Sequence, residues 1–143
     1  MAQTDSSLSI AADFGNLSAV KDFVRRQAKM LRVPERLSGK LELVVEELFL
    51  NIVNYAHPKL KEEVDIRCSR HSIGDTQGEM ICIAIQDWGP PFNPLEKDNP
   101  ALEQNVEERP IGGLGVYLVT QMADYCTYAR QNENNCFTVC FHL

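Results

Sequence analysis

The chain has 143 residues, 44% hydrophobic and 24% charged, with a formal net charge of −6. This composition excludes global disorder and predicts one globular domain over residues 1–143, and the acidic balance, without a Lys/Arg run, argues against nucleic acid as a partner. No stretch reaches the roughly 20 apolar residues that span a bilayer, and residues 1–7 lack a signal-peptide pattern. We therefore expect a cytoplasmic protein without a membrane partner.

The periodicity of apolar residues predicts eight elements. In chain order these are a strand at 8–14, helices at 17–31 and 34–56, strands at 64–69 and 80–86, a helix at 114–123, and strands at 125–130 and 136–142. Asn16 is placed to cap the first helix. Strands joined as hairpins imply a mixed, mainly antiparallel sheet, and three amphipathic helices would cover one face of it. The predicted fold class is therefore α/β, a two-layer sandwich.

A proline-rich segment interrupts this pattern between Trp88 and Pro110, where five of the seven prolines lie. Loops of about twenty residues are uncommon in small domains and are usually functional lids or disordered segments. We predict a lid at residues 88–111. For Trp88 we expect packing at the rim of this lid, with contact to a partner as the alternative.

The five cysteines are odd in number and form no CxxC pair. Most of them lie in apolar, strand-like contexts, where free cysteine behaves as a small hydrophobic residue. We therefore predict structural thiols without a metal or disulfide role.

The stretch "RPIGGLGVYLV", Arg109–Val119, places three glycines directly before an apolar helix. It matches neither the phosphate-loop pattern nor the dinucleotide fingerprint. Backbone N–H groups at a helix start lack intrahelical partners, and glycine lets an anion approach them closely. This pattern favours phosphate binding, and a flexible hinge or tight turn is an equal alternative.

The stretch "EELFLNIVNYAHP", Glu46–Pro58, carries Glu47, Asn51 and Asn54 along one line beside an apolar helical stripe. Glu46 points about 100° away from Glu47 and is expected to face solvent. An amide oxygen one turn from a carboxylate suits a hard cation such as Mg²⁺, and the carboxylate can accept a proton from a hydroxyl nucleophile. The alternative is a helix cap or a satisfied polar network.

The third stretch is "DWGPPFNP", Asp87–Pro94, in which Asp87 ends a buried strand and Gly89 follows. A carboxylate at this place needs a partner, such as an exocyclic amine of the adenine type. The alternative is a turn that ends the strand.

Residues 41–143 carry four features in a fixed order: a helix with an asparagine, the sequence Asp-x-Gly-x-Pro-Phe, a lid, and GGxG before a helix. In this order, the features resemble the GHKL ATPase superfamily. Glu47-x-x-x-Asn51, Asp87–Phe92 and "ERPIGGLGVYLV" are similar to the small anti-sigma-factor serine/threonine kinases of partner-switching pathways. Tyr55 and His57 depart from the usual order of histidine and tyrosine after the asparagine, and we assign them no role.

The resemblance implies a role for each matching residue, with ATP and Mg²⁺ as cofactors. Glu47 would be the general base on a partner's serine, Asn51 would bind Mg²⁺, and Asp87 would bind the adenine amine with Gly89 beside the ring. The residues of the glycine stretch implied to face the nucleotide are Arg109, Gly112, Gly113, Leu114, Gly115 and Val116.

The resemblance further implies an ATP-dependent protein kinase that binds a sigma factor and phosphorylates an anti-sigma-factor antagonist. It also implies a homodimer that uses the first strand and helix. Arg25, Arg26 and Lys29 would then be available to an acidic sigma-factor surface, or would form a solvated helix face. The alternative function is a catalytically inactive, ATP-gated binding module that regulates a partner protein.

Overall fold

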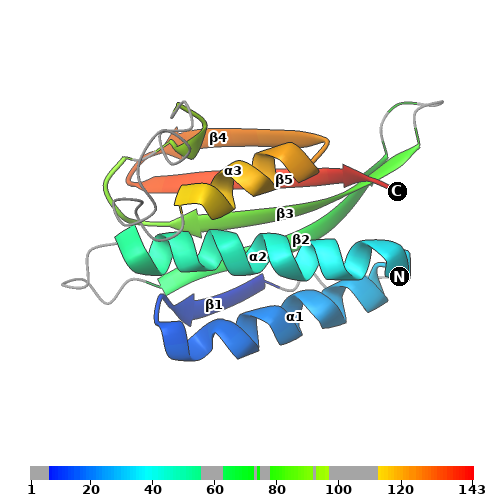
Figure 1. The fold of residues 1–143 in the computed structure, drawn as a ribbon, viewed down its shortest axis with the longest axis horizontal. Helices are drawn as coiled ribbons and strands as arrows, with labels where there is room; N and C mark the ends of the chain where they lie inside the picture. The colour runs from blue at the N-terminus through cyan, green and yellow to red at the C-terminus, as the bar shows by residue number, and fades with distance from the viewer. Residues whose placement is uncertain (1–6, 56–62, 73, 75–77, 92, 97–112) are drawn as a thin grey trace.

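The computed structural model describes residues 7–55, 63–72, 74, 78–91, 93–96 and 113–143. The elements in chain order are β1 (Ser7–Ala11), a 3-10 turn (Phe14–Asn16), α1 (Leu17–Met30), α2 (Glu35–Tyr55), β2 (Glu63–Ser72), β3 (Glu79–Asp87), a 3-10 turn (Pro94–Glu96), α3 (Gly113–Met122), β4 (Tyr125–Gln131) and β5 (Asn134–His142). The strands form one sheet in the order β1-β2-β3-β5-β4 (Figure 1). The predicted order of elements is confirmed.

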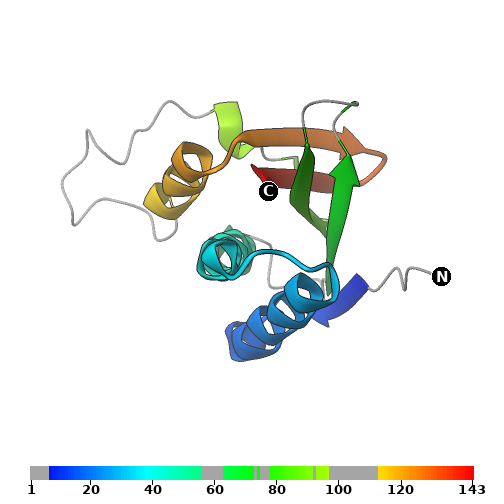
Figure 2. The ribbon, with the colours of Figure 1, turned by 90° about the vertical axis from the view of Figure 1, so that its right-hand side faces the viewer.

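The three helices lie on the same side of the sheet, so the predicted two-layer α/β sandwich is confirmed (Figure 2). Every pair of neighbouring strands in the described sheet is antiparallel. The sheet is therefore not mixed, because β5 returns between β4 and β3 and runs opposite to both. None of the helices in the described ranges combines the length and the apolar character needed to cross a membrane.

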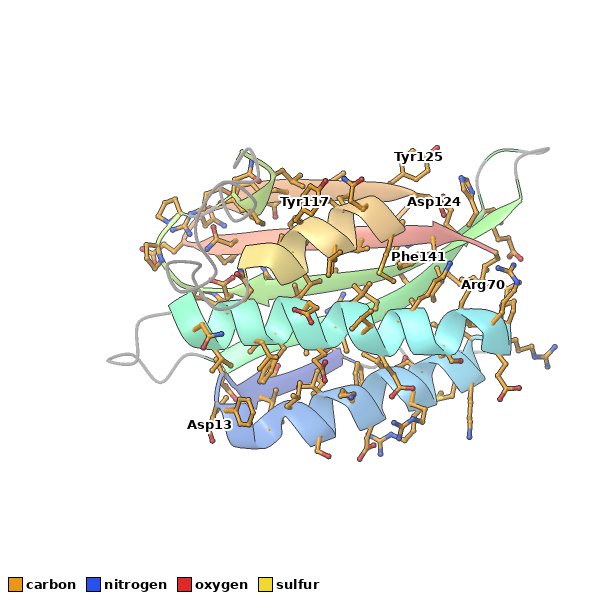
Figure 3. The ribbon with its side chains drawn as sticks, viewed as in Figure 1. Asp13, Arg70, Tyr117, Asp124, Tyr125 and Phe141 are labelled. Atoms are coloured by element: carbon orange, nitrogen blue, oxygen red, sulfur yellow. A yellow bond between two sulfur atoms is a disulfide. The ribbon has the colours of Figure 1, made fainter. Side chains whose placement is uncertain are left out.

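The core lies between the sheet and the helices, and alternation along the strands places it there. Ile81, Ile83 and Ile85 of β3 are almost completely buried on the helix side. Phe141 of β5 belongs to the same cluster and lies between the layers (Figure 3). Phe49 of α2 is fully buried. The central helix α2 therefore rests on a rigid apolar layer, which fixes the positions of its polar side chains.

Ion pairs join α1 to α2 on the outer surface of the helical layer. Lys21 Nζ lies 3.1 Å from Glu46 Oε1, and Arg25 Nη2 lies 2.6 Å from Glu42 Oε1. Arg25 also pairs with Asp22 on its own helix. The predicted basic group is therefore partly neutralised, because Arg25 is engaged by two carboxylates while Arg26 and Lys29 stay exposed.

The hydrogen bonds at the two ends of α1 could not be predicted from the local sequence. Asn16 was predicted to cap the helix with its side chain, but its Nδ2 donates to the Ala11 carbonyl at 2.9 Å and makes no cap bond. At the other end, Arg70 Nη1 donates to the carbonyls of Leu31 and Arg32, at 2.7 and 3.1 Å (Figure 3). A cation at this position also suits the negative end of the helix dipole.

The prediction that all five cysteines are free is wrong for two of them, because Cys82 and Cys140 form a disulfide between β3 and β5. They stand directly opposite each other in the register of these strands. The two residues are 58 positions apart in the sequence, so only the strand pairing brings them together. Cys68, Cys126 and Cys136 are free thiols, and burial raises the pKa of Cys68 to about 12.

Candidate functional site

The polar line predicted on the central helix is present on α2. Glu47 is half-buried, Asn51 is 9% exposed and Asn54 is exposed. Residues four apart on a helix share one face, so Glu47 and Asn51 are held one turn apart by the regular backbone of α2. The apolar side chains that anchor α2 in the core therefore also fix the direction of this pair.

Glu46 and Glu47 are adjacent in the sequence, but their side chains point toward different neighbouring helices. Glu46 was expected to face solvent, but it is half-buried and pairs with Lys21 on α1. Glu47 points to the other side of α2 and lies against α3, since a Cβ built on Gly115 would overlap its Oε2. The rotation of about 100° per residue along a helix separates the two carboxylates in this way.

The contact between Glu47 and Gly115 places the carboxylate at the first turn of α3. The two helices pack against each other and run in opposite directions (Figure 1). Gly115 is the third residue of α3 and is buried. The N–H groups of this first turn have no partner within the helix, which makes it a place where a bound anion can be stabilised.

The environment of Glu47 raises the pKa of its carboxyl group. Burial is the main cause, and the nearby charge of Glu46 adds to it. No residue in the described ranges donates a hydrogen bond to this carboxylate, so nothing there offsets the loss of hydration. A carboxylate with a raised pKa is a better proton acceptor, which suits a general base.

Asn51 is a buried polar side chain without a hydrogen-bond partner among the described residues. Buried polar groups usually have partners, so an unpartnered carboxamide is a feature that calls for an explanation. Its amide oxygen is a ligand type that Mg²⁺ accepts, together with waters and phosphate oxygens. The residue therefore fits the predicted metal role.

Asp87 is the last residue of β3, and its side chain shapes the turn that follows. Its Oδ1 accepts hydrogen bonds from the Gly89 backbone N–H at 2.9 Å and from Asn135 Nδ2 at 3.0 Å. Within the described ranges, the other oxygen, Oδ2, accepts no hydrogen bond. One oxygen thus holds the turn while the second can receive a donor from a ligand. Gly89, whose N–H donates to Asp87 in this turn, is buried.

Residues from the last two strands support the turn at Asp87, and no sequence pattern indicated them. Asn135 Nδ2 also donates to the Pro90 carbonyl at 3.0 Å, and Arg130 Nη1 donates to the Gly89 carbonyl at 2.8 Å. The Tyr128 hydroxyl donates to Asn135 Oδ1. Asn135 stands opposite Asp87 in the register of β3 and β5, and this long-range pairing was not predicted.

Replacing Asn135 by alanine is expected to destabilise the fold by about 1–3 kcal/mol, because the part-buried acceptors on Asp87 and Pro90 lose their donor. We also expect the turn that carries Asp87 and Gly89 to loosen. Urea unfolding measures the first effect, and amide hydrogen exchange at Gly89 measures the second. The exposed Gln131 is the control, since Gln131→Ala removes an amide from the same hairpin. Equal effects of the two substitutions would contradict this role of Asn135.

The predicted residues of the glycine stretch are described only in part. Arg109 and Gly112 lie outside the described residues, as do positions 97–108 of the predicted lid. Gly113 and Leu114 open α3, and Val116 is buried. The end of α2, the end of β3 and the start of α3 lie at the same end of the molecule (Figure 1). Three segments far apart in the sequence thus lie at one end of the molecule.

Comparisons with known proteins identify the family of the chain. No curated protein matches the chain in sequence. A solved structure of the Acinetobacter baumannii histidine kinase AdeS aligns with a TM-score of 0.46 and 15% identity, covering 98% of this chain and 68% of that chain. The family model of the histidine kinase-like ATPase domain matches residues 10–141. The chain therefore belongs to the histidine kinase-like ATPase domain family.

Proposed function

We propose that this protein is an ATP-dependent serine/threonine kinase that acts as an anti-sigma factor in a partner-switching pathway. Domains of its family bind ATP and generally Mg²⁺. The kinase assignment adds a protein hydroxyl as the acceptor, and the observation that carries it is the position of Glu47. This carboxylate is half-buried, has a raised pKa and lies one turn from Asn51.

The nucleotide would be held by groups at the ends of three elements. Asp87 Oδ2 accepts no hydrogen bond within the described ranges, so it would accept one from the adenine amine, and Gly89 has no side chain that would block the ring. The first turn of α3 presents backbone N–H groups to the phosphates. Asn51 would hold Mg²⁺, which when bound neutralises charge on the phosphate oxygens.

In the transfer step, the hydroxyl oxygen of the substrate serine attacks the γ-phosphorus of ATP. An oxygen–phosphorus bond forms to serine, and the bond between the γ-phosphorus and the β–γ bridging oxygen breaks. The bridging oxygen keeps the electron pair and leaves with ADP. The serine proton passes to the carboxylate of Glu47, which holds the hydroxyl in line. Positioning and charge stabilisation supply most of the catalysis in such reactions.

The partners would be a sigma factor and a small anti-sigma-factor antagonist, with a homodimer formed through β1 and α1. Arg26 and Lys29 on α1 are exposed and could meet an acidic surface of the sigma factor. Arg25 is less suited to this role, because it is already paired with Asp22 and Glu42. A protein that regulates a sigma factor would act in the cytoplasm.

A transfer assay tests the proposal. The protein is incubated with γ-labelled ATP, Mg²⁺ and candidate antagonists encoded near its gene, and label is followed on the acceptor protein. We expect label on a serine or threonine of one antagonist. Tight ATP binding with neither transfer nor hydrolysis would contradict the kinase assignment and favour the ATP-gated binding module.

A further inference from the structure

We propose that Gly115 is a positioning residue for Glu47: its missing side chain leaves the space in which the Glu47 carboxylate rests against α3. This inference rests on the proposed function, because it concerns the carboxylate assigned as the base. Gly115 would make room for the Glu47 carboxylate, whereas the sequence resemblance implied that it contacts phosphate. Gly112 and Gly113 keep that predicted role.

The contact is closer than any side chain at position 115 would allow. A Cβ built on Gly115 would overlap Glu47 Oε2, lie 2.7 Å from Cδ and lie 3.4 Å from Cγ. Only the last of these distances is an ordinary van der Waals contact. Gly115 is also buried, so its hydrogen atoms face packed protein. The end of the Glu47 side chain therefore uses space that any other residue type would fill.

An alanine at position 115 would move the carboxylate and leave the fold intact. The atoms that collide are the far end of a flexible side chain, while the Cγ distance is tolerable. Rotation about the side-chain bonds of Glu47 relieves the overlap without shifting α2 or α3. The carboxylate would then leave its place beside α3 and become more hydrated.

The pKa of Glu47 is a direct measure of this movement. Glu46 on α2 is the charge that acts on Glu47, and α3, which packs against α2, carries no charged side chain. A substitution at Gly115 leaves Glu46 unchanged. Burial is the main cause of the raised pKa, so a carboxylate that moves into solvent should titrate closer to its ordinary value.

The experiment compares Gly115→Ala with Gly39→Ala in the full chain. Gly39 is also in a helix, but a Cβ there meets nothing within 4 Å. For Gly115→Ala we expect a lower Glu47 pKa by NMR, a loss of phosphoryl transfer of about 100-fold, and nearly unchanged ATP affinity. For Gly39→Ala we expect no change in the pKa, in transfer or in affinity.

Two results would overturn the proposal. One is a Glu47 pKa that stays raised in Gly115→Ala, and the other is a loss of ATP affinity as large as the loss of transfer. If Gly115→Ala does not fold, the double variant Glu47→Ala/Gly115→Ala decides, since removal of the carboxylate restores the space. We expect the double variant to fold, and its failure would also overturn the proposal. If the native protein transfers no phosphate, the proposed function fails, but the pKa comparison still tests the contact.

Discussion

Replacement of Glu47 by glutamine is expected to reduce phosphoryl transfer by about 10²–10⁴-fold, because the amide cannot take the serine proton. ATP binding should persist, since the residues assigned to the nucleotide are unchanged. Initial rates with labelled ATP measure the transfer, and calorimetry measures the binding. The control is Glu46→Gln, which removes the adjacent carboxylate and its ion pair with Lys21. Equal loss in both variants would contradict the assignment of Glu47.

The raised pKa of Glu47 adds a stability test of the same substitution. A carboxyl group with a higher pKa in the folded state stabilises the fold below its unfolded pKa, and this contribution is lost as pH rises through the folded pKa. Glutamine removes this loss. Glu47→Gln should therefore be more stable than the native protein at neutral pH, and urea unfolding at two pH values measures the difference. Lower stability at neutral pH would contradict the burial argument.

Replacement of Asn51 by alanine is expected to weaken ATP binding in the presence of Mg²⁺ by about tenfold or more. Interactions with a charged group contribute about 1.5–3 kcal/mol, which sets this magnitude. The effect should shrink when Mg²⁺ is removed, because the amide oxygen acts through the metal. Titration calorimetry with and without Mg²⁺ measures both affinities.

Asn54→Ala is the matched control for Asn51→Ala. It removes the same chemical group from the next turn of α2, but Asn54 is exposed whereas Asn51 is buried. We expect native affinity in this control under both conditions. An Asn51→Ala variant that binds Mg²⁺-ATP as well as Asn54→Ala does would show that the buried amide has no metal role.

Local patterns predicted the elements well, because helices and hairpins depend on nearby residues. The helix that carries Glu47 and Asn51 was predicted over residues 34–56, and its described part runs from Glu35 to Tyr55. The strand that ends at Asp87 was also placed within one residue at each end. Apolar periodicity sets such boundaries, and both segments are strongly periodic.

The contacts that the sequence could not predict are those between residues far apart in the chain. The register of β3 against β5 places Asn135 opposite Asp87, and it also places Cys82 opposite Cys140. Neither pair leaves a local signal, so the support of the Asp87 turn and the disulfide were both missed. The contact between Glu47 and Gly115 likewise depends on how α2 and α3 pack. The motifs indicated one site, but the interactions that stabilise this site depend on tertiary contacts.

The central claim is that adenosine triphosphate and a divalent ion bind where α2, β3 and α3 converge. Calorimetric titration of the folded protein with ATP, with and without Mg²⁺, tests it most directly, and GTP is the control because guanine presents a carbonyl where adenine presents an amine. We predict heat of binding and a rise in the thermal midpoint with ATP, larger with Mg²⁺ and absent with GTP. A folded sample that shows neither heat nor a thermal shift with Mg²⁺-ATP would contradict the account.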